Sequence, residues 1–330
     1  SASFWDCPEF ITTGYKLEVG HPPGAPFFML TANLFSQFAS DPSQVAYMVN
    51  VMSALLSAGC ILFLFWSITH LTRRLICGNS TTIKAGQMVT IFGAGLVGAL
   101  AYTFSDTFWY SAVEGEVYAY SSFFTAVVFW FILKWEEEAG SVHSDRWLIL
   151  IAYMMGLSVG VHLLNLLCIP AIVLIYYYKK RPNAGWKGSL MALIVSAVLI
   201  AAILYGIVPG IVKVGGWFEL LFVNGFSMPF NTGLIIYIVV LVAALVCSIW
   251  ETYAARSAAR TNIAFIAVVA LTGLPFYGHG FKCVALGLVV LAALAIYLFN
   301  MDKLKEQWRM SARVMSTALV SIMMIVIGYS

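Results

Sequence analysis

Two acids, a lysine and a histidine lie close together near the beginning of the chain. Asp6 and Glu9 are three residues apart, so their side chains would share one face of a helix. Lys16 and His21 follow in the same short segment. Only 10% of the residues are charged, and ionisable groups beside apolar segments are costly unless they bind something or do chemistry. A carboxylate here could act as a general base, or the pair could hold a divalent cation through oxygen ligands.

The same spacing also fits a structural role, in which Asp6 caps a short helix and Glu9 reaches back to it. The sequence that follows the acids favours the site interpretation. Pro22 and Pro23 fix the backbone, and Gly24 allows a tight turn. We therefore expect these three residues to form a rigid turn that holds the acids at the membrane surface.

A second pair of acids, Glu114 and Glu116, lies in a polar interval between two apolar segments. On a helix the two side chains cannot point the same way. Glu114 fits the common role of an acid near a helix N-terminus, which is stabilising by about 0.3–1 kcal/mol. Glu116 is already followed by apolar residues, so we expect it to point into the helix bundle as part of a site.

The composition indicates a membrane protein. Hydrophobic residues make up 61% of the chain, the mean hydropathy is +0.89, and apolar runs of about twenty residues recur between polar intervals. We expect an all-α, polytopic transmembrane helical bundle with about ten crossings over 45–330, preceded by an outward-facing first loop over 1–44. The spans lie at roughly 45–69, 86–105, 116–134, 147–161, 165–178, 188–209, 233–250, 263–280, 283–300 and 314–330.

Some classes of site and partner are disfavoured. No basic patch with interleaved aromatic residues is present, which argues against a nucleic-acid partner. The six cysteines form no CxxC pair and lie mostly in apolar runs, as small buried hydrophobes do. The chain starts at Ser1 with no signal-peptide pattern, so we expect a helix to precede it in the full protein.

Basic residues give the expected orientation. The intervals 73–84, 134–146, 179–187, 256–260 and 303–313 hold 15 of the 18 lysines and arginines and are expected on the cytoplasmic side. The apolar run 147–178 lies between two of these intervals, so it must cross an even number of times. This predicts two short crossings separated by a broken helix at 160–165, an arrangement tolerated inside protein. The first loop, Glu116, His162 and the 210–232 loop would then face outward.

Further elements and candidates follow from this orientation. The Phe-rich segment 25–39 is too short to span and predicts an amphipathic helix on the outer leaflet, with Pro26 in its first turn. The acidic run 136–138 is expected to be a solvated loop. His162 could be either a hydrogen-bonded core residue or a site residue. Candidate ligands for substrate or lipid phosphate are Lys16, His21, His162, Asn165, His279 and Lys282, although the last two could be interfacial anchors.

Taken together, these motifs resemble the protein O-mannosyltransferase-like branch of the GT-C superfamily of membrane glycosyltransferases. The resemblance rests on Trp5-Asp6-Cys7-x-Glu9-Phe10, Gly20-His21-Pro22-Pro23-Gly24, Phe108-Trp109-x-Ser111, Glu116-Val117-Tyr118, and Gly156-Leu157-Ser158 leading to His162. It covers about residues 1–180, and the later spans match only in being hydrophobic. The sequence looks especially similar to a bacterial group related to vertebrate O-mannosyltransferases of plexin-type receptors. This implies a bacterial inner-membrane protein whose site faces the periplasm.

The resemblance implies a GT-C-like enzyme that moves a sugar, expected to be mannose, from a polyprenyl-phosphate donor to a hydroxyl of a protein or glycan acceptor. An outer-face acid is the catalytic base in that superfamily, which corresponds here to Asp6 or Glu9, and a second-loop acid corresponds to Glu116 beside Glu114. A single displacement would invert the sugar. Whether a divalent metal takes part stays open. A transporter or lipid flippase with a broken helix at 160–165 is the alternative, and a non-catalytic membrane subunit is a third.

Overall fold

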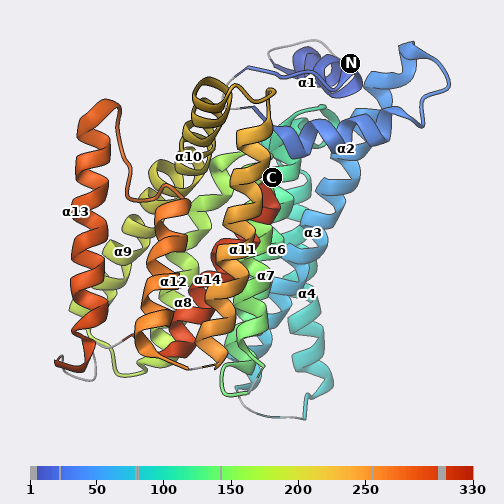
Figure 1. The fold of residues 1–330 in the computed structure, drawn as a ribbon. Coiled ribbons are helices and arrows are strands. Elements are labelled where there is room, and N and C mark those ends of the chain that lie inside the picture. Colours follow the sequence, from blue (N-terminus) through green and yellow to red (C-terminus); the bar gives the residue numbers. More distant parts are fainter. Residues whose placement is uncertain are drawn as a thin grey trace. The chain divides into compact units, whose positions relative to one another are not determined.

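The computed structural model of the protein describes residues 6–21, 24–78, 80, 82–141, 143–254, 256–303 and 310–329. Helices make up most of this part, and it contains no strand. Two compact units are present, one formed by Ser1–Ala184 with Met324–Ser330 and the other by Gly185–Met323. Figure 1 shows the order of the helices along the chain. The expected polytopic, all-helical fold is confirmed.

The first unit carries the two acidic segments. Its helices are α1 (Cys7–Lys16), α2 (Pro26–Ser36), η1 (Pro42–Gln44), α3 (Val45–Cys77), α4 (Ala85–Thr103), α5 (Asp106–Val113), α6 (Val117–Glu138), α7 (Asp145–Val159), η2 (Leu163–Cys168) and α8 (Ile169–Lys180). The residues of α14 (Ala312–Tyr329) from Met324 onward also belong to this unit. The sequence suggested a boundary at 44/45, and α3 begins there. However, α1 and α2 pack on α3 within the same unit.

The second unit begins with one long helical stretch. It comprises α9 (Trp186–Ala201), η3 (Ala202–Ile207), α10 (Val208–Leu220), η4 (Leu221–Gly225), α11 (Thr232–Ala254), α12 (Ala258–Leu271), α13 (Gly280–Phe299) and η5 (Met301–Lys303), together with α14 up to Met323. The stretch Trp186–Gly225 is helical throughout. The expected loop at 210–232 is therefore wrong for most of its length. A proline usually interrupts a helix, but the carbonyl four residues before Pro209 lies in the π-helical turn η3, whose wider i→i+5 bonding accommodates a proline.

Most expected spans are long enough to cross a bilayer. The described helices that are long and apolar enough are Pro42–Cys77, Ala85–Thr103, Val117–Glu138, Leu163–Lys180, Trp186–Gly225, Thr232–Ala254 and Gly280–Phe299. Ala258–Leu271 and Val314–Gly328 are shorter apolar helices. Helix α7 has 15 residues and would be about 22 Å long, against roughly 30 Å of hydrocarbon. Each expected span overlaps a helix, although α12 ends at Leu271 and leaves the second half of 263–280 outside it; among the described residues, seven helices reach spanning length.

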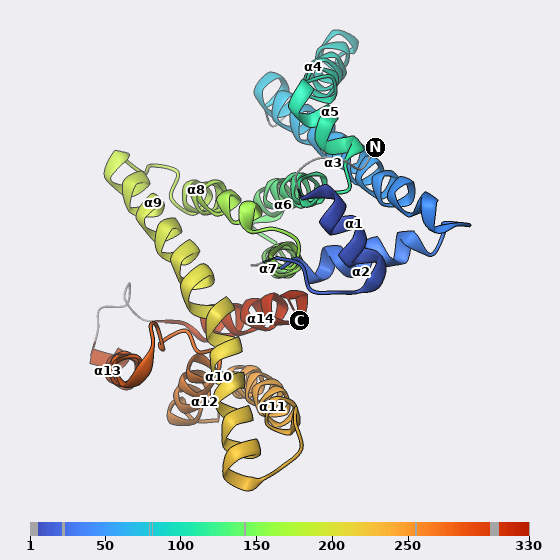
Figure 2. The same cartoon turned by 90° about the horizontal axis from the view of Figure 1, so that it is seen from above.

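Helices α1 and α2 lie across one end of the first unit, over the ends of the upright helices α3, α6 and α7 (Figure 1, and from above in Figure 2). Helix α2 is the helix expected at 25–39, and Pro26 is in its first turn. One face of α2 is buried, since Phe28 and Ala32 are fully covered. Leu30 and Leu34 on the other face are more than half exposed, so α2 presents apolar side chains to its surroundings as an interfacial helix does.

The broken helix predicted at 160–165 is confirmed. Helix α7 ends at Val159 and η2 begins at Leu163. The Gly160 carbonyl accepts hydrogen bonds from the backbone N–H groups of Phe27, at 2.8 Å, and Phe28, at 3.4 Å, at the start of α2. Backbone groups buried away from water must find such partners. The break is thus held by α2.

The acidic run 136–138 is not a solvated loop, because α6 continues through Glu138. Glu136 is buried and forms ion pairs with Arg74 of α3 and with Lys179 of α8. The ion-pair partners come from distant parts of the sequence, which explains why a local reading of three consecutive acids missed them. The contacts also bring the basic ends of α3, α6 and α8 together on one side, as the expected orientation requires.

Candidate functional site

Asp6 and Glu9 lie in the first turn of α1, but they do not form a capping box. Asp6 occupies the N-cap position without a side-chain cap hydrogen bond. The Glu9 carboxylate instead meets His21: its Oε1 atom accepts the His21 backbone N–H at 2.7 Å and lies 3.2 Å from His21 Nδ1. The capping alternative is therefore wrong, and the two carboxylates are directed to a third residue.

His21 stands between the two acids. Its Nε2 atom is 3.9 Å from Asp6 Oδ2, and one ligand atom from each of the three residues lies within 4.8 Å of the others. The three side chains are 40–44% exposed, so a solute can reach them. Two carboxylate oxygens and an imidazole nitrogen form a donor set suited to a divalent transition metal. Ligand atoms around one such ion are about 4 Å apart or less, so the three side chains would have to move slightly closer together to bind it.

The chain reverses after α1, and this reversal brings His21 back to Glu9. Leu17 adopts a left-handed conformation with φ of 53° and ends the helix. A Cβ atom on Gly20 would lie only 3.3 Å from Glu9 Oε1, so glycine leaves room for the carboxylate. Gly24 has φ of 77°, and its N–H donates to the His21 carbonyl at 2.9 Å. Pro22 and Pro23 of the expected turn lie outside the described residues.

Aromatic packing fixes this segment to the fold. The Phe10 ring lies 5.7 Å from the His21 ring and 5.4 Å from the ring of Phe28 on α2, measured between centroids. Gly14 of α1 approaches Ala32 of α2 so closely that an added Cβ would be 2.8 Å from the alanine Cβ. These contacts belong to the core cluster beneath α1 and α2. The first turn of α1, with Asp6 and Glu9, is consequently held in place by this packing.

Hydrogen bonds lower the pKa of Glu9. The backbone N–H of His21 has the largest effect, and the His21 side chain adds to it. Both donors stabilise the carboxylate form. Glu9 therefore remains ionised to a lower pH than an ordinary glutamate.

The second-loop acid Glu116 lies against the beginning of α1. It occupies the N-cap position of α6 and is only 6% exposed. The backbone N–H of Cys7 donates to its carboxylate. Burial raises the pKa of Glu116, and the negative charges of Glu114 and Asp6 raise it further. The structure thus brings Asp6, Glu114 and Glu116 into electrostatic contact.

Glu114 is the half-buried residue that follows α5. Its carbonyl accepts the Glu116 N–H at 2.9 Å, which makes the connection to α6 tight. Gly115 between them is equally constrained, because a Cβ there would lie 2.9 Å from side-chain atoms of Ile11 and Val49. Glu114 follows α5 and lies two residues before Glu116, the N-cap of α6, so it stands near a helix N-terminus, where the sequence placed it.

His162 lies in the break and contacts the beginning of α6. Its ring is 5.6 Å from the ring of Tyr118, two residues after Glu116. The Leu164 N–H donates to His162 Nδ1 at 3.1 Å, which leaves Nε2 as the protonated nitrogen of the neutral ring. Burial lowers the pKa of His162, favouring that neutral form. His162 can thus donate one hydrogen bond through Nε2.

Asn165 has a different environment. It is fully buried, and its amide nitrogen donates to Ser158 Oγ at 3.0 Å and contacts Met155 Sδ at 3.2 Å. Its carbonyl oxygen accepts from Thr125 Oγ1 at 3.2 Å. These contacts join α6, α7 and η2. Asn165 lies in the packed core around the break, where its polar atoms already have partners.

Lys16 is not brought to the acids, and His279 and Lys282 belong to the other unit. Lys16 is exposed in the last turn of α1, about 10 Å along the helix from Glu9. His279 and Lys282 are exposed at the beginning of α13 in the second unit. Beside them, sequence reasoning missed Lys213: its Nζ atom donates to the carbonyls of Phe276, at 2.8 Å, and Gly278, at 2.6 Å. No local sequence signal connects residues so far apart.

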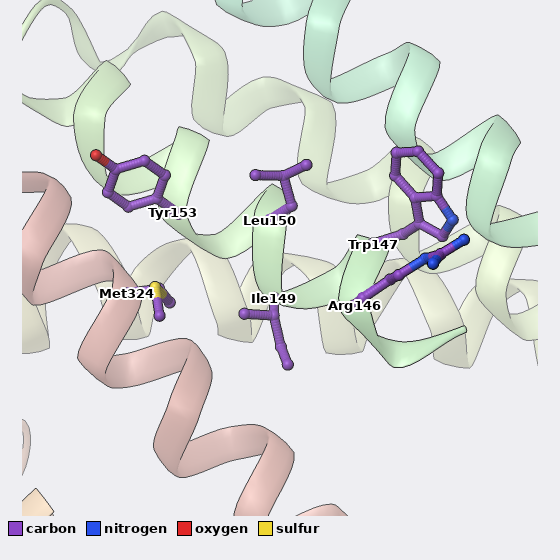
Figure 3. A pocket seen from close by; sticks show the side chains of 6 residues that line it. All are labelled: Arg146, Trp147, Ile149, Leu150, Tyr153 and Met324. Carbon is purple, nitrogen blue, oxygen red and sulfur yellow. The ribbon is translucent and has the colours of Figure 1, made fainter. Parts of the chain in front are cut away.

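A hollow of about 510 Å³ between α7 and α14 contains none of the predicted site residues. Figure 3 shows the side chains that line it, namely Arg146, Trp147, Ile149, Leu150, Tyr153 and Met324. Most of these side chains are apolar, and the Arg146 guanidinium pairs with Glu138 at 2.8 Å.

Residues 6–185 match the family model of the protein O-mannosyl-transferase TMEM260 N-terminal domain. The chain belongs to this family. The match includes both acidic segments and the broken helix, and it ends one residue beyond Ala184, where the main part of the first unit ends. The resemblance expected from the motifs is confirmed at the level of the family.

Two curated relatives carry the same name. Protein O-mannosyl-transferase TMEM260 of Mus musculus is 28% identical over 179 residues, and its namesake in Dictyostelium discoideum is 24% identical over 212 residues. The alignments cover 53% and 61% of this chain but only 23% and 24% of the relatives. No solved structure matches the chain. Both relatives are eukaryotic, so they give no support to the bacterial inner membrane expected from the sequence, whereas the apolar helices do identify an integral membrane protein.

Proposed function

We propose that the protein takes part in membrane O-mannosylation, transferring mannose from a polyprenyl-phosphate donor to a Ser or Thr hydroxyl of a protein acceptor. The family name of its relatives and the membrane-spanning helices support this function. One structural observation carries the proposal. The beginning of α1, with Asp6, meets the buried second-loop acid Glu116 through the Cys7 N–H.

Asp6 is the proposed general base. A Ser or Thr hydroxyl is a poor nucleophile at neutral pH, and a carboxylate at about 2.6–3.2 Å can take its proton during attack. Glu9 is already engaged by the backbone and side chain of His21, which lowers its pKa and its basicity. Asp6 Oδ2 lies 3.9 Å from His21 Nε2, beyond hydrogen-bond distance, so no such bond to His21 occupies the Asp6 carboxylate.

The proposed reaction is a single displacement. The acceptor oxygen attacks the anomeric carbon while the bond from that carbon to the phosphate oxygen breaks. The bonding electrons leave with the polyprenyl phosphate, and the acceptor proton passes to Asp6. Attack from the face opposite the leaving group inverts the anomeric centre. Donors near the developing phosphate charge would assist departure, and the Nε2–H of His162 is suited to this role.

Glu116 is proposed as a positioning residue. Its carboxylate accepts the Cys7 N–H, so it holds the first turn of α1 and thereby the backbone that carries Asp6. The donor's long apolar tail explains why such a site is built beside membrane helices. A divalent cation, held by Asp6, Glu9 and His21, would supply charge neutralisation for the phosphate.

The transporter alternative is less consistent with the break. In secondary transporters the ends of broken helices line a substrate site near the bilayer midplane, whereas the Gly160 carbonyl at this break is bonded to the backbone of Phe27 and Phe28. Acids also gather at α1 and at the N-terminus of α6, outside the spanning segments. We therefore propose transfer rather than transport.

The direct test is mannosyl transfer by the full-length protein, with polyprenyl-phosphate mannose and a Ser/Thr peptide. We expect Asp6→Asn to lower kcat by roughly 100- to 10,000-fold, as loss of a general base does. Glu9→Gln should have a smaller effect through His21. Glu18→Gln is the matched control, since it removes an exposed acid just beyond the end of α1.

Two results would refute the catalytic assignment. Unchanged transfer in both Asp6→Asn and Glu9→Gln would remove Asp6 and Glu9 from the mechanism. Uptake of a labelled solute by the wild-type protein along a gradient, with no sugar transfer under any condition, would favour the transporter. The positioning role of Glu116 is separate: Glu116→Gln should lower kcat less than Asp6→Asn does, because its amide oxygen still accepts the Cys7 N–H.

A further inference from the structure

A polar pocket of about 230 Å³ lies where the ends of α3, α6 and α8 meet, on the side that the basic residues indicate to be cytoplasmic. It is at the end of the first unit away from α1 and the acidic segments. The side chains that matter are His70, Arg73 and Arg74 of α3, Glu137 of α6 and Lys179 of α8. The glycosyltransferase proposal uses none of them.

Positive charge exceeds negative charge around this pocket. Arg74 and Lys179 share a single carboxylate, that of the buried Glu136. The Glu137 carboxylate is paired with Lys134 at 2.7 Å. No acid in the described part of the chain lies within ion-pair distance of Arg73, which is exposed. Three cations, Arg73, Arg74 and Lys179, and one carboxylate, Glu137, therefore line the pocket, so an anion can bind there.

The arginines also retain hydrogen-bonding capacity. A guanidinium has five N–H donors in a planar fork that matches a phosphate. Arg74 uses one terminal nitrogen on Glu136, and its side chain is still 52% exposed. Arg73, the preceding residue, lies on the same wall. The pair can therefore bind two oxygens of one phosphate group, as arginines commonly do.

Aromatic residues beside the pocket are of the kinds that gather at the level of lipid headgroups. Lys134 lies 4.9 Å from the ring centre of Trp130, and Lys180 lies 5.9 Å from that of Trp135. Trp135 in turn stacks on Tyr176 at 4.8 Å. Tryptophan and tyrosine gather at the interface between membrane and water. A basic pocket between spanning helices at that depth on the cytoplasmic side is suited to an anionic headgroup.

We propose that this pocket binds the phosphate of an anionic phospholipid in the cytoplasmic leaflet, with Arg73 and Arg74 as its main donors. The bound lipid would join the ends of α3, α6 and α8. The pocket is a second ligand site, remote from the proposed transfer chemistry, and it does not depend on that chemistry.

The test is lipid binding to the purified full-length protein in neutral detergent, counted by native mass spectrometry. Phosphatidylglycerol, phosphatidylcholine and inorganic phosphate are titrated in separate arms. We expect phosphatidylglycerol to bind and phosphatidylcholine not to bind. Arg73→Gln should weaken binding about fivefold, the effect of one basic residue near an anionic surface, and Glu137→Gln should strengthen it. Arg146→Gln is the matched control, since this arginine lines the separate hollow in Figure 3 and pairs with Glu138.

Three results would overturn the proposal. If Arg146→Gln and Arg73→Gln weakened phosphatidylglycerol binding equally, the binding would reflect general charge attraction and not a specific site. Binding of inorganic phosphate that depends on Arg73 and displaces the lipid would make free phosphate the ligand. Failure of Arg73→Gln to change phosphatidylglycerol binding in a folded protein, judged by an unchanged Tm, would exclude the pocket. Sugar transfer is a separate readout, so neither proposal stands or falls with the other.

Discussion

Asp6 and Glu9 are chemically similar carboxylates in unequal surroundings. Glu9 accepts two hydrogen bonds from His21, and Asp6 approaches the same imidazole only at 3.9 Å. Sequence spacing correctly put both acids on α1, but it could not separate their roles. The separating contact comes from His21, which returns only because the chain reverses at Leu17. The position of His21 depends on the backbone conformation of this loop, which cannot be read from the residue types alone.

The link between Glu9 and His21 should depend on pH. The pKa of Glu9 is lowered from its ordinary value of 4.5, so the link contributes stability above 4.5 and loses it as pH falls through the lower, folded-state pKa. Hydrogen exchange of the His21 amide, corrected for the intrinsic rate, should show protection that falls in this acidic range. Glu9→Gln should lack the transition. The same acid transition in Glu9→Gln would assign it to another group.

Glu116 was found from sequence because an acid stood directly before an apolar run. Its burial and its raised pKa agree with that position. Its hydrogen-bond donor, the Cys7 N–H, could not be predicted from residue types. A backbone group at a helix beginning carries no residue-type signal.

At the scale of elements, glycines set how closely helices approach. A Cβ on Gly156 of α7 would lie 2.5 Å from the carbonyl oxygen of Ile325 on α14, which is backbone and cannot move aside easily. Gly328 makes the reciprocal approach, since its Cβ would lie 2.6 Å from the Leu157 nitrogen. The two helices are therefore in backbone contact through glycine.

Gly156→Ala should destabilise the first unit by about 1–3 kcal/mol through overpacking. Gly93→Ala is the matched control: Gly93 lies within α4, and an added Cβ meets nothing within 4 Å. That control should be neutral or slightly stabilising, because alanine favours helix. Thermal unfolding in detergent distinguishes them. Equal Tm values for both variants would show that α7 and α14 do not make this contact in the membrane protein.

Helix positions were largely predictable, because the length of each apolar segment can be counted in the local sequence. The break at 160–165 was predictable from an even-crossing argument based on basic residues. The helical stretch through Pro209 and the helical acids at 136–138 were not, since the first depends on a π-helical turn and the second on Arg74 and Lys179. Prediction failed where long-range contacts or an altered hydrogen-bond register decided the structure.

At the scale of the whole molecule, orientation can be tested without any activity assay. Glu18 lies just beyond α1, and Ser141 lies between α6 and α7 at the other end of the first unit. In intact cells, an impermeant maleimide should label Glu18→Cys and should label Ser141→Cys only after permeabilisation. Labelling is measured above the background of the native cysteines. The reverse pattern would place Asp6 and Glu116 in the cytoplasm and would contradict an outward-facing site.

The hydrogen bonds from Phe27 and Phe28 to the Gly160 carbonyl have a consequence for biosynthesis. Residues 27 and 28 leave the ribosome long before residue 160, so α2 has to wait on the membrane surface while more than a hundred residues are made and inserted. Contacts between distant parts of a chain form late and slowly. The outer acidic segment should therefore acquire its final position only after the broken helix has been inserted, which would leave the nascent protein inactive until then.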